Sequence, residues 1–163
     1  MTPRHSCLMA LVLMCGCTNT TTRTVTSLQA IDEKSRIEVL AFQWLMRHDE
    51  STGISQKYAV ILCINKSDPP QSIFGAISPL HKNVLPCTTR VDYAKGNGEL
   101  RVGGDPAKAA IMLSLSDITV NANEVRVGAS YFEASQSAAW YTIVLRKTDG
   151  IWQIVNVYMN GIA

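Results

Sequence analysis

The last stretch of the chain, residues 138–159, constrains the fold more than any other part of the sequence. It reads AAWYTIVLRKTDGIWQIVNVYM, with Asp149-Gly150 between two runs that are rich in β-branched and aromatic residues. Asp-Gly in this setting is a strong signal for a β-hairpin. We therefore predict two long antiparallel strands joined by a tight turn, with the rest of the domain organised around them.

The length of the turn decides which residues face each other across the hairpin. A two-residue turn places Ile143 opposite Asn156, whereas a three-residue turn on 148–150 places Ile143 opposite Val155. We predict the second register because it pairs like with like, and such cross-strand pairs stabilise by roughly 0.2–1 kcal/mol each. One face, expected in the core, then carries Tyr141, Ile143, Leu145, Val155, Val157 and Met159. The other face carries Trp140, Thr142, Val144, Trp152, Ile154, Asn156 and Tyr158.

The second face of this hairpin mixes aromatic and polar side chains. In the predicted register Thr142 lies opposite Asn156, and Trp140 and Tyr158 lie towards the ends of the face. Apolar walls with a few polar groups are the usual composition of a small-molecule site. We therefore consider these four residues a ligand-binding site. The alternative is an ordinary surface ladder, or a second packing face under a helix, since mixed faces are common in sheets.

Residues 1–16 have the parts of a secretory signal, namely a basic Arg4, the apolar run LMALVLM at 8–14 and a small Gly16 before Cys17. The apolar run is shorter than the roughly 20 residues that span a bilayer. The segment resembles the lipobox of bacterial lipoproteins. That resemblance implies that Cys17 is lipidated, for example with palmitate, and anchors the protein in the membrane. Thr18 after the cysteine points, by the same resemblance, to the outer membrane. An ordinary signal peptide is the alternative.

The cysteines agree with export to the periplasm or the cell surface. Of the five, Cys7 and Cys15 leave with the signal peptide and Cys17 carries the lipid, so Cys63 and Cys87 remain. Two cysteines in an oxidising compartment predict one disulfide, worth about 3 kcal/mol in the chain-entropy model. The alternatives are two separate buried cysteines or a metal site, and neither cysteine has the CxxC or HxxxH spacing that a metal site requires.

The exported chain divides into a Thr-rich tether at 17–27 and a single domain at 28–163. Residues 28–47 carry a helical pattern, with Ser27, or the pair Ser35 and Glu38, as start signals. The apolar stripe of this helix consists of Ile37, Leu40, Ala41, Trp44 and Leu45. Residues 57–65 predict a buried strand, Asp68 caps a short helix at 71–80, and the turn-rich segment 95–106 is interpreted as a loop.

From residue 110 onwards the chain predicts strands joined by short turns, at 110–120, at 124–132 and in the closing hairpin. We therefore predict an α+β fold class, in which an N-terminal amphipathic helix packs on a curved antiparallel sheet with a four-stranded C-terminal meander.

Two sets of residues carry a resemblance to known families. One set is Ile37 to His48, Tyr131-Phe132-Glu133 and Asp149-Gly150-Ile151-Trp152, which resembles the nuclear transport factor 2-like superfamily of cone-shaped α+β domains. The other set is Cys63, Asp68-Pro69, Cys87 and the turn from Tyr131 through Ser135 to Ala138. It resembles a family of uncharacterised bacterial exported lipoproteins, although Leu62 stands where that family tends to have an aromatic residue. The resemblance supports the fold and the disulfide, and it implies no activity.

The sequence contains little that suggests catalysis. His48 beside Asp49 is a possible base and its orienting acid, but a solvated helix end is the better explanation of the pair. No cofactor, metal or nucleic-acid site is expected, because the net charge is only +2 and the basic residues form no stripe. We expect an envelope lipoprotein with a non-catalytic module that binds a protein or small ligand. The alternative is a small-molecule binder, or an isomerase- or dehydratase-like enzyme of the cone type.

Overall fold

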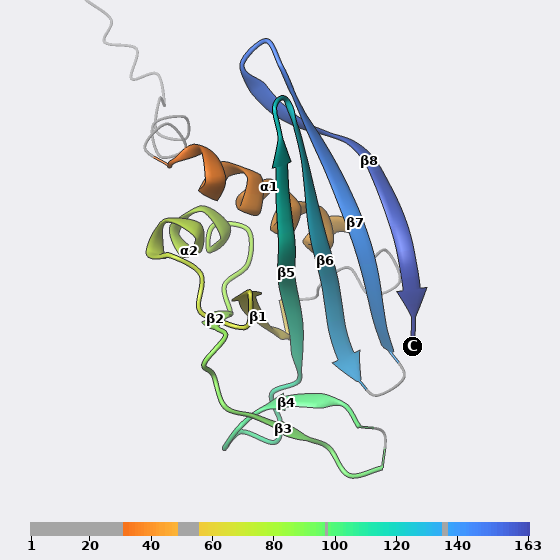
Figure 1. Ribbon diagram of the computed structural model, residues 1–163. Coiled ribbons are helices and arrows are strands. Elements are labelled where there is room, and N and C mark those ends of the chain that lie inside the picture. Colours follow the sequence, from red (N-terminus) through yellow and green to blue (C-terminus); the bar gives the residue numbers. More distant parts are fainter. Residues whose placement is uncertain (1–30, 49–55, 97, 135–136) are drawn as a thin grey trace, which may run out of the picture.

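The computed structural model describes residues 31–48, 56–96, 98–134 and 137–163 (Figure 1). The helices of these segments are α1 (Glu33–His48) and α2 (Gln71–Ile77). The strands are β1 (Ala59–Ile64), β2 (Val84–Pro86), β3 (Val91–Tyr93), β4 (Leu100–Val102), β5 (Ala110–Asn121), β6 (Glu124–Ala134), β7 (Ser137–Thr148) and β8 (Ile151–Ile162). About half of the described residues are in strands.

The predicted fold class is wrong, because the main sheet is mixed and has six strands. Its order is β2-β1-β5-β6-β7-β8, and a separate two-stranded sheet pairs β3 with β4. Strand β1 runs parallel to both of its neighbours, whereas β5 to β8 are antiparallel to one another. An antiparallel sheet under one N-terminal helix therefore does not describe this molecule, and β4 lies in a segment that we interpreted as a loop.

The parallel pairing belongs to the unit β1-α2-β2, in which α2 crosses between two parallel strands. All six residues of β1, AVILCI, are buried. A continuous apolar run is typical of a strand that is covered on both faces, as parallel strands usually are. Alternate residues of β1 pack in different hydrophobic clusters. The main core contains Val60, Leu62 and Ile64, and a smaller cluster contains Ala59, Ile61 and Cys63.

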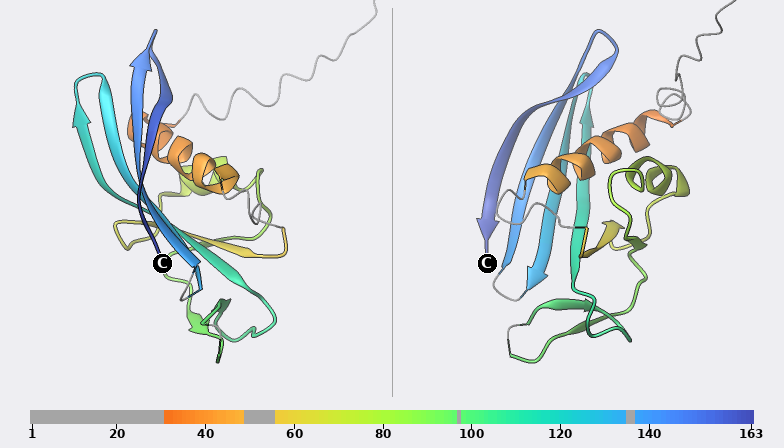
Figure 2. Two further views of the ribbon diagram at one scale, coloured as in Figure 1. Left: turned by 90° about the vertical axis from the view of Figure 1, so that its right-hand side faces the viewer. Right: turned by 180° about the vertical axis from the view of Figure 1, so that it is seen from behind.

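The two clusters lie on opposite faces of the sheet. The main core lies between the sheet and the helices, with α1 crossing one face and α2 beside it (Figures 1 and 2). The smaller cluster lies on the other face, where Leu100 and its neighbours on β3 and β4 cover the ends of β1 and β5. The helices therefore cover one face of the sheet, and the small β3–β4 ribbon covers only part of the other.

Helix α1 begins later than the sequence pattern suggested. The backbone N–H of Ser35 donates to Asp32 Oδ1 at 3.0 Å and the Ser35 hydroxyl donates to Asp32 Oδ2 at 2.6 Å, so Asp32 is the N-cap. These hydrogen bonds, that of the hydroxyl first, lower the pKa of the Asp32 carboxyl. The predicted capping role of Ser35 with Glu38 is wrong, and Ser27 lies outside the described residues. The predicted stripe also missed Phe42, which is fully buried.

The predicted register of the closing hairpin is wrong as well. Asp149 and Gly150 both have positive φ, 51° and 78°, which is the conformation of a two-residue type I′ turn. Thr148 therefore pairs with Ile151 at the end of the strands. A bulge then adds Val155 as an extra residue, and Ile143 pairs with Val157.

The two-residue turn and the bulge together place several side chains on the opposite face from the one predicted. Trp152 and Ile154, expected on the second face, pack against the main core, and Val155 is 48 % exposed. Met159 pairs with buried Tyr141 but is itself 61 % exposed. A change of one residue in the pairing register is sufficient to exchange the two faces, because side chains alternate between the faces of a strand with a period of two.

Candidate binding surfaces

The disulfide predicted from the cysteine arithmetic is present between Cys63 and Cys87. Strand β1 pairs with β2 in parallel through Val60–Val84 to Leu62–Pro86, so the cysteines occupy the next position of the same register. The bond therefore closes the β1-α2-β2 crossover at the end of the strand pair. Its position gives it a structural role in holding β2 beside β1.

A second link crosses the same loop next to the disulfide. Thr88 donates two hydrogen bonds to the carboxylate of Asp68, from its backbone N–H at 2.7 Å and from its hydroxyl at 2.9 Å. Asp68 is therefore not the cap of α2, as we predicted; Pro70 occupies the N-cap position and makes no side-chain cap bond. The carboxylate holds the loop after β2 instead.

The predicted ligand-binding residues lie on the face of β7 and β8 that points away from the helices. Trp140 is 46 % exposed and Tyr158 is 50 % exposed. Between them Asn160 donates a hydrogen bond from Nδ2 to Thr142 Oγ1 at 3.0 Å, and Thr142 pairs with Tyr158 across the strands. We call Trp140, Thr142, Tyr158 and Asn160 the outer patch. Two half-exposed aromatic rings thus flank a polar pair on an open sheet face.

Asn156 does not belong to the outer patch in the way we predicted. It pairs with Val144 and not with Thr142, and its Oδ1 accepts a hydrogen bond from the backbone N–H of Val157 at 2.9 Å. Asn160, a residue the sequence analysis did not single out, is the extra residue at a second register shift, between Met159 and Gly161, and it lies beside Thr142. The four predicted residues are therefore only partly brought together, and their role in ligand binding stays a prediction.

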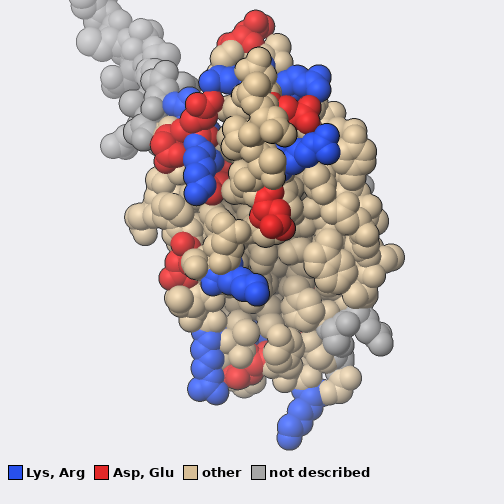
Figure 3. Space-filling model, viewed as in Figure 1, with Lys and Arg blue, Asp and Glu red and all other residues tan. Residues whose placement is uncertain are grey.

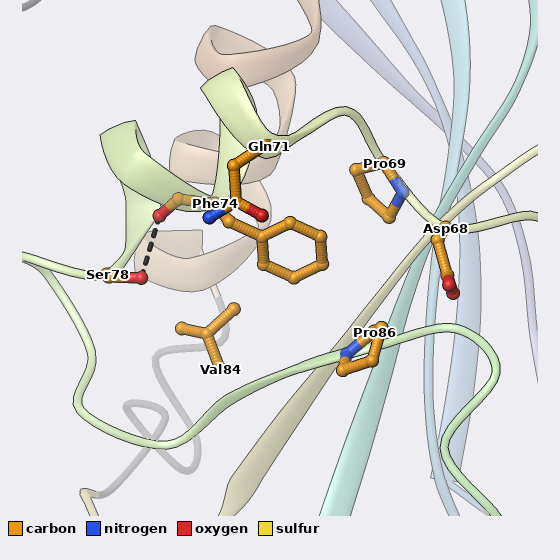
Figure 4. A pocket seen from close by; sticks show the side chains of 7 residues that line it. All are labelled: Asp68, Pro69, Gln71, Phe74, Ser78, Val84 and Pro86. Atoms are coloured by element: carbon orange, nitrogen blue, oxygen red, sulfur yellow. Dashed lines mark hydrogen bonds between the residues drawn. The ribbon is translucent and has the colours of Figure 1, made fainter.

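A groove of about 420 Å³ lies between α2 and β2, with the ring of Phe74 on its floor (Figure 4). Pro69, Val84 and Pro86 supply further apolar walls, and the lining also includes Asp68, Gln71 and Ser78. Two of these polar groups are already bonded, because Asp68 accepts from Thr88 and the Ser78 hydroxyl donates to the carbonyl of Phe74. The groove thus combines an apolar floor with few free polar groups.

A cluster of three side chains fastens the start of α1 to the closing hairpin. Glu33 Oε1 accepts hydrogen bonds from Lys147 Nζ at 2.6 Å and from the indole Nε1 of Trp152 at 2.8 Å. The bond from Lys147, followed by that from Trp152, lowers the pKa of the Glu33 carboxyl. The sequence offers no local signal for these long-range partners of Glu33.

The part of the chain that the structure describes holds no cluster of three His, Cys, Asp or Glu side chains suited to a metal ion. His81 is 2 % exposed, and its Nδ1 accepts a hydrogen bond from the backbone of Asn83. Burial raises the pKa of the Glu38 carboxyl, an effect that Lys34 at 3.8 Å partly offsets. Asp49 lies outside the described residues, so its pairing with His48 stays a hypothesis.

Comparison with known proteins gave no match to any family model, curated protein or solved structure. The resemblances drawn from the sequence therefore stay predictions. Neither helix of the described segments combines the length and the apolar character needed to cross a membrane.

Proposed function

We propose that the chain is a lipid-anchored protein of the bacterial envelope, attached to the outer membrane through Cys17, whose domain binds another protein without catalysis. The lipobox-like sequence before Cys17 supports the anchor. The Cys63–Cys87 disulfide supports the compartment, because such bonds persist in oxidising environments and are rare in the cytosol. The Thr-rich residues 18–26 give the domain a tether to the membrane.

The exposure of Trp140 and Tyr158 on the outer patch is the observation that carries the binding function. Each ring leaves about half of its surface in contact with water on a face that the helices do not cover. Tryptophan and tyrosine dominate the hot spots of protein–protein interfaces, where one end of the side chain is apolar and the other polar. The Thr142–Asn160 pair between them adds hydrogen-bonding groups that fix the orientation of a partner.

The anchor predicts that Cys17→Ser releases the protein from the membrane. The wild-type chain should sediment with the outer-membrane fraction and carry the mass of attached fatty acids. The variant lacks the thiol that is lipidated, so it should show no lipid mass and should be recovered in the soluble fraction or with an uncleaved N-terminus. Cys15→Ser is the matched control, and it should leave lipidation unchanged. Lipid on the Cys17→Ser chain would contradict the assignment.

The outer patch predicts that Trp140→Ala weakens partner binding by roughly 30-fold or more, since hot-spot residues contribute about 2 kcal/mol or more. The measurement is retention of envelope proteins by the immobilised, anchored chain, followed by titration of the retained protein. Tyr93→Ala is the matched control, because Tyr93 is an exposed aromatic residue (64 %) on the separate β3–β4 sheet. Equal retention by both variants would contradict the assignment of the binding site to the outer patch.

A further inference from the structure

Strand β8 is an edge of the main sheet, and its composition is unusual for an edge. Its twelve residues, IWQIVNVYMNGI, include no charged residue and no proline. Five of the nine exposed large apolar side chains of the described segments lie on it: Ile151, Val155, Tyr158, Met159 and Ile162. Charged side chains lie at the top, on the left and at the bottom of the molecule in Figure 3, while the right-hand flank, along β8, shows none between them. Proteins normally protect such edges with lysine, proline or a covering element.

The other open edges of the described sheets are protected. Strand β2, at the opposite end of the main sheet, has three residues and ends in Pro86. Beyond its pairing with β1, β5 carries a bulge and the charged Asp117, whose φ is 48°. Strands β3 and β4 have three residues each. Strand β8 also has register shifts, at Val155 and at Asn160, but it is long and has no charged residue and no proline. Among the described edges it is therefore the one that best favours pairing with another strand.

We propose that β8 pairs with β8 of a second copy of this chain, in antiparallel orientation about a two-fold axis. A self-complementary contact closes after two subunits, whereas pairing of β8 with a different edge would continue into a fibre. The short β2 edge with Pro86 disfavours that second arrangement. The absence of charge on β8 means that no like charges meet in the dimer, in whichever register the strands pair.

The contact is large enough to hold two subunits together reversibly. Twelve residues span about 40 Å at roughly 3.4 Å per residue. One side of an antiparallel strand offers about half of its backbone groups, so each subunit contributes at most about six N–H and about six C=O groups, and fewer where the register shifts at Val155 and Asn160 interrupt the alternation. The resulting bonds are as numerous as the roughly ten of a typical protein interface. Exposed Tyr158, Met159 and Ile162 lie along the seam and lose contact with water in the dimer.

The test is the mass of the full lipidated chain in detergent, measured by light scattering over a range of concentrations. We expect a monomer–dimer equilibrium, and we expect amide hydrogens of residues 151–162 to exchange more slowly as the dimer forms. Val155→Lys introduces the residue that natural edge strands use to prevent pairing. It should weaken dimerisation at least tenfold while leaving the thermal unfolding temperature close to that of the wild type, because Val155 is already half exposed.

Val120→Lys is the matched control, since Val120 is 64 % exposed on β5, away from β8. It should dimerise like the wild type. The inference is overturned if the wild-type chain is monomeric at every concentration, if it forms larger assemblies, or if Val155→Lys dimerises as tightly as Val120→Lys. It does not rest on the proposed function. Tyr158 and Asn160 of the outer patch lie on β8, but Trp140→Ala changes a residue of β7 and leaves the backbone edge of β8 intact, so the two proposals can fail separately.

Discussion

Replacing Phe42 by alanine should lower the free energy of unfolding by about 3–5 kcal/mol, the range found for large aromatic residues in protein cores. Phe42 is fully buried in the cluster between α1 and the sheet. The substitution removes the apolar contacts of the ring and leaves a cavity that close-packed neighbours fill only in part. Since domains of this size are stable by about 5–15 kcal/mol, the variant should lose a large fraction of its stability.

Chemical denaturation followed by circular dichroism measures this effect. Phe74→Ala is the matched control, because Phe74 is only partly buried beside the same cluster and faces the groove. Its loss should be clearly smaller. A loss for Phe42→Ala no larger than that for Phe74→Ala would show that α1 does not pack on the sheet as described.

Removing the disulfide with the double substitution Cys63→Ala and Cys87→Ala should lower the free energy of unfolding by about 3 kcal/mol. The bond joins residues 24 positions apart, so its loss returns conformational freedom to the unfolded crossover segment. Alanine is preferred to serine because Cys63 is only 2 % exposed. A serine hydroxyl at this position would be buried without a hydrogen-bond partner. Thermal and urea unfolding under non-reducing conditions measure the difference.

The control for the disulfide is the effect of a reducing agent. Dithiothreitol should destabilise the wild-type protein by a similar amount and leave the double variant unchanged. Part of the β1–β2 geometry should survive in the variant, because Asp68 and Thr88 still hold the loop through two hydrogen bonds. Equal stability of the oxidised and reduced wild-type protein would contradict a stabilising role for the bond.

The elements that the sequence predicted well are those with a strong local pattern. The apolar run of β1 identified a buried strand, and Asp149-Gly150 identified the final turn. The disulfide followed from counting the cysteines that remain once those of the predicted signal peptide and the predicted lipidation site are set aside. In each case a few neighbouring residues, or a simple count, contain the necessary information.

The fold class could not be obtained in the same way. The residues that neighbour β1 in the sequence do not indicate that it pairs with β2 and β5, or that both strands run parallel to it. The continuous apolar sequence of β1 is typical of a strand covered on both faces. It favoured parallel pairing, whereas we predicted an antiparallel sheet. The three-residue strands β2, β3 and β4 are too short for any period to be recognised, so the extent of the sheet was not predictable.

In the outer patch, too, the sequence predicted the local features but not the contacts between distant residues. Trp140, Thr142 and Tyr158 do share an exposed face, as alternation along the strands suggested. The bulge at Val155 replaced the expected partner Asn156 by Asn160. The contacts of Glu33 with Lys147 and Trp152 join residues more than a hundred positions apart, and no local pattern reports such pairs.

The sequence by itself determined the turn at Asp149-Gly150, because both residues tolerate positive φ, and it determined the apolar strand and the cysteine pair. The tertiary structure alone decided the direction of β1, the bulge at Val155, and the exposure of β8 as an edge. The physical reason is that strand partners, register shifts and burial depend on contacts between distant segments, whose combined free energy outweighs any local preference.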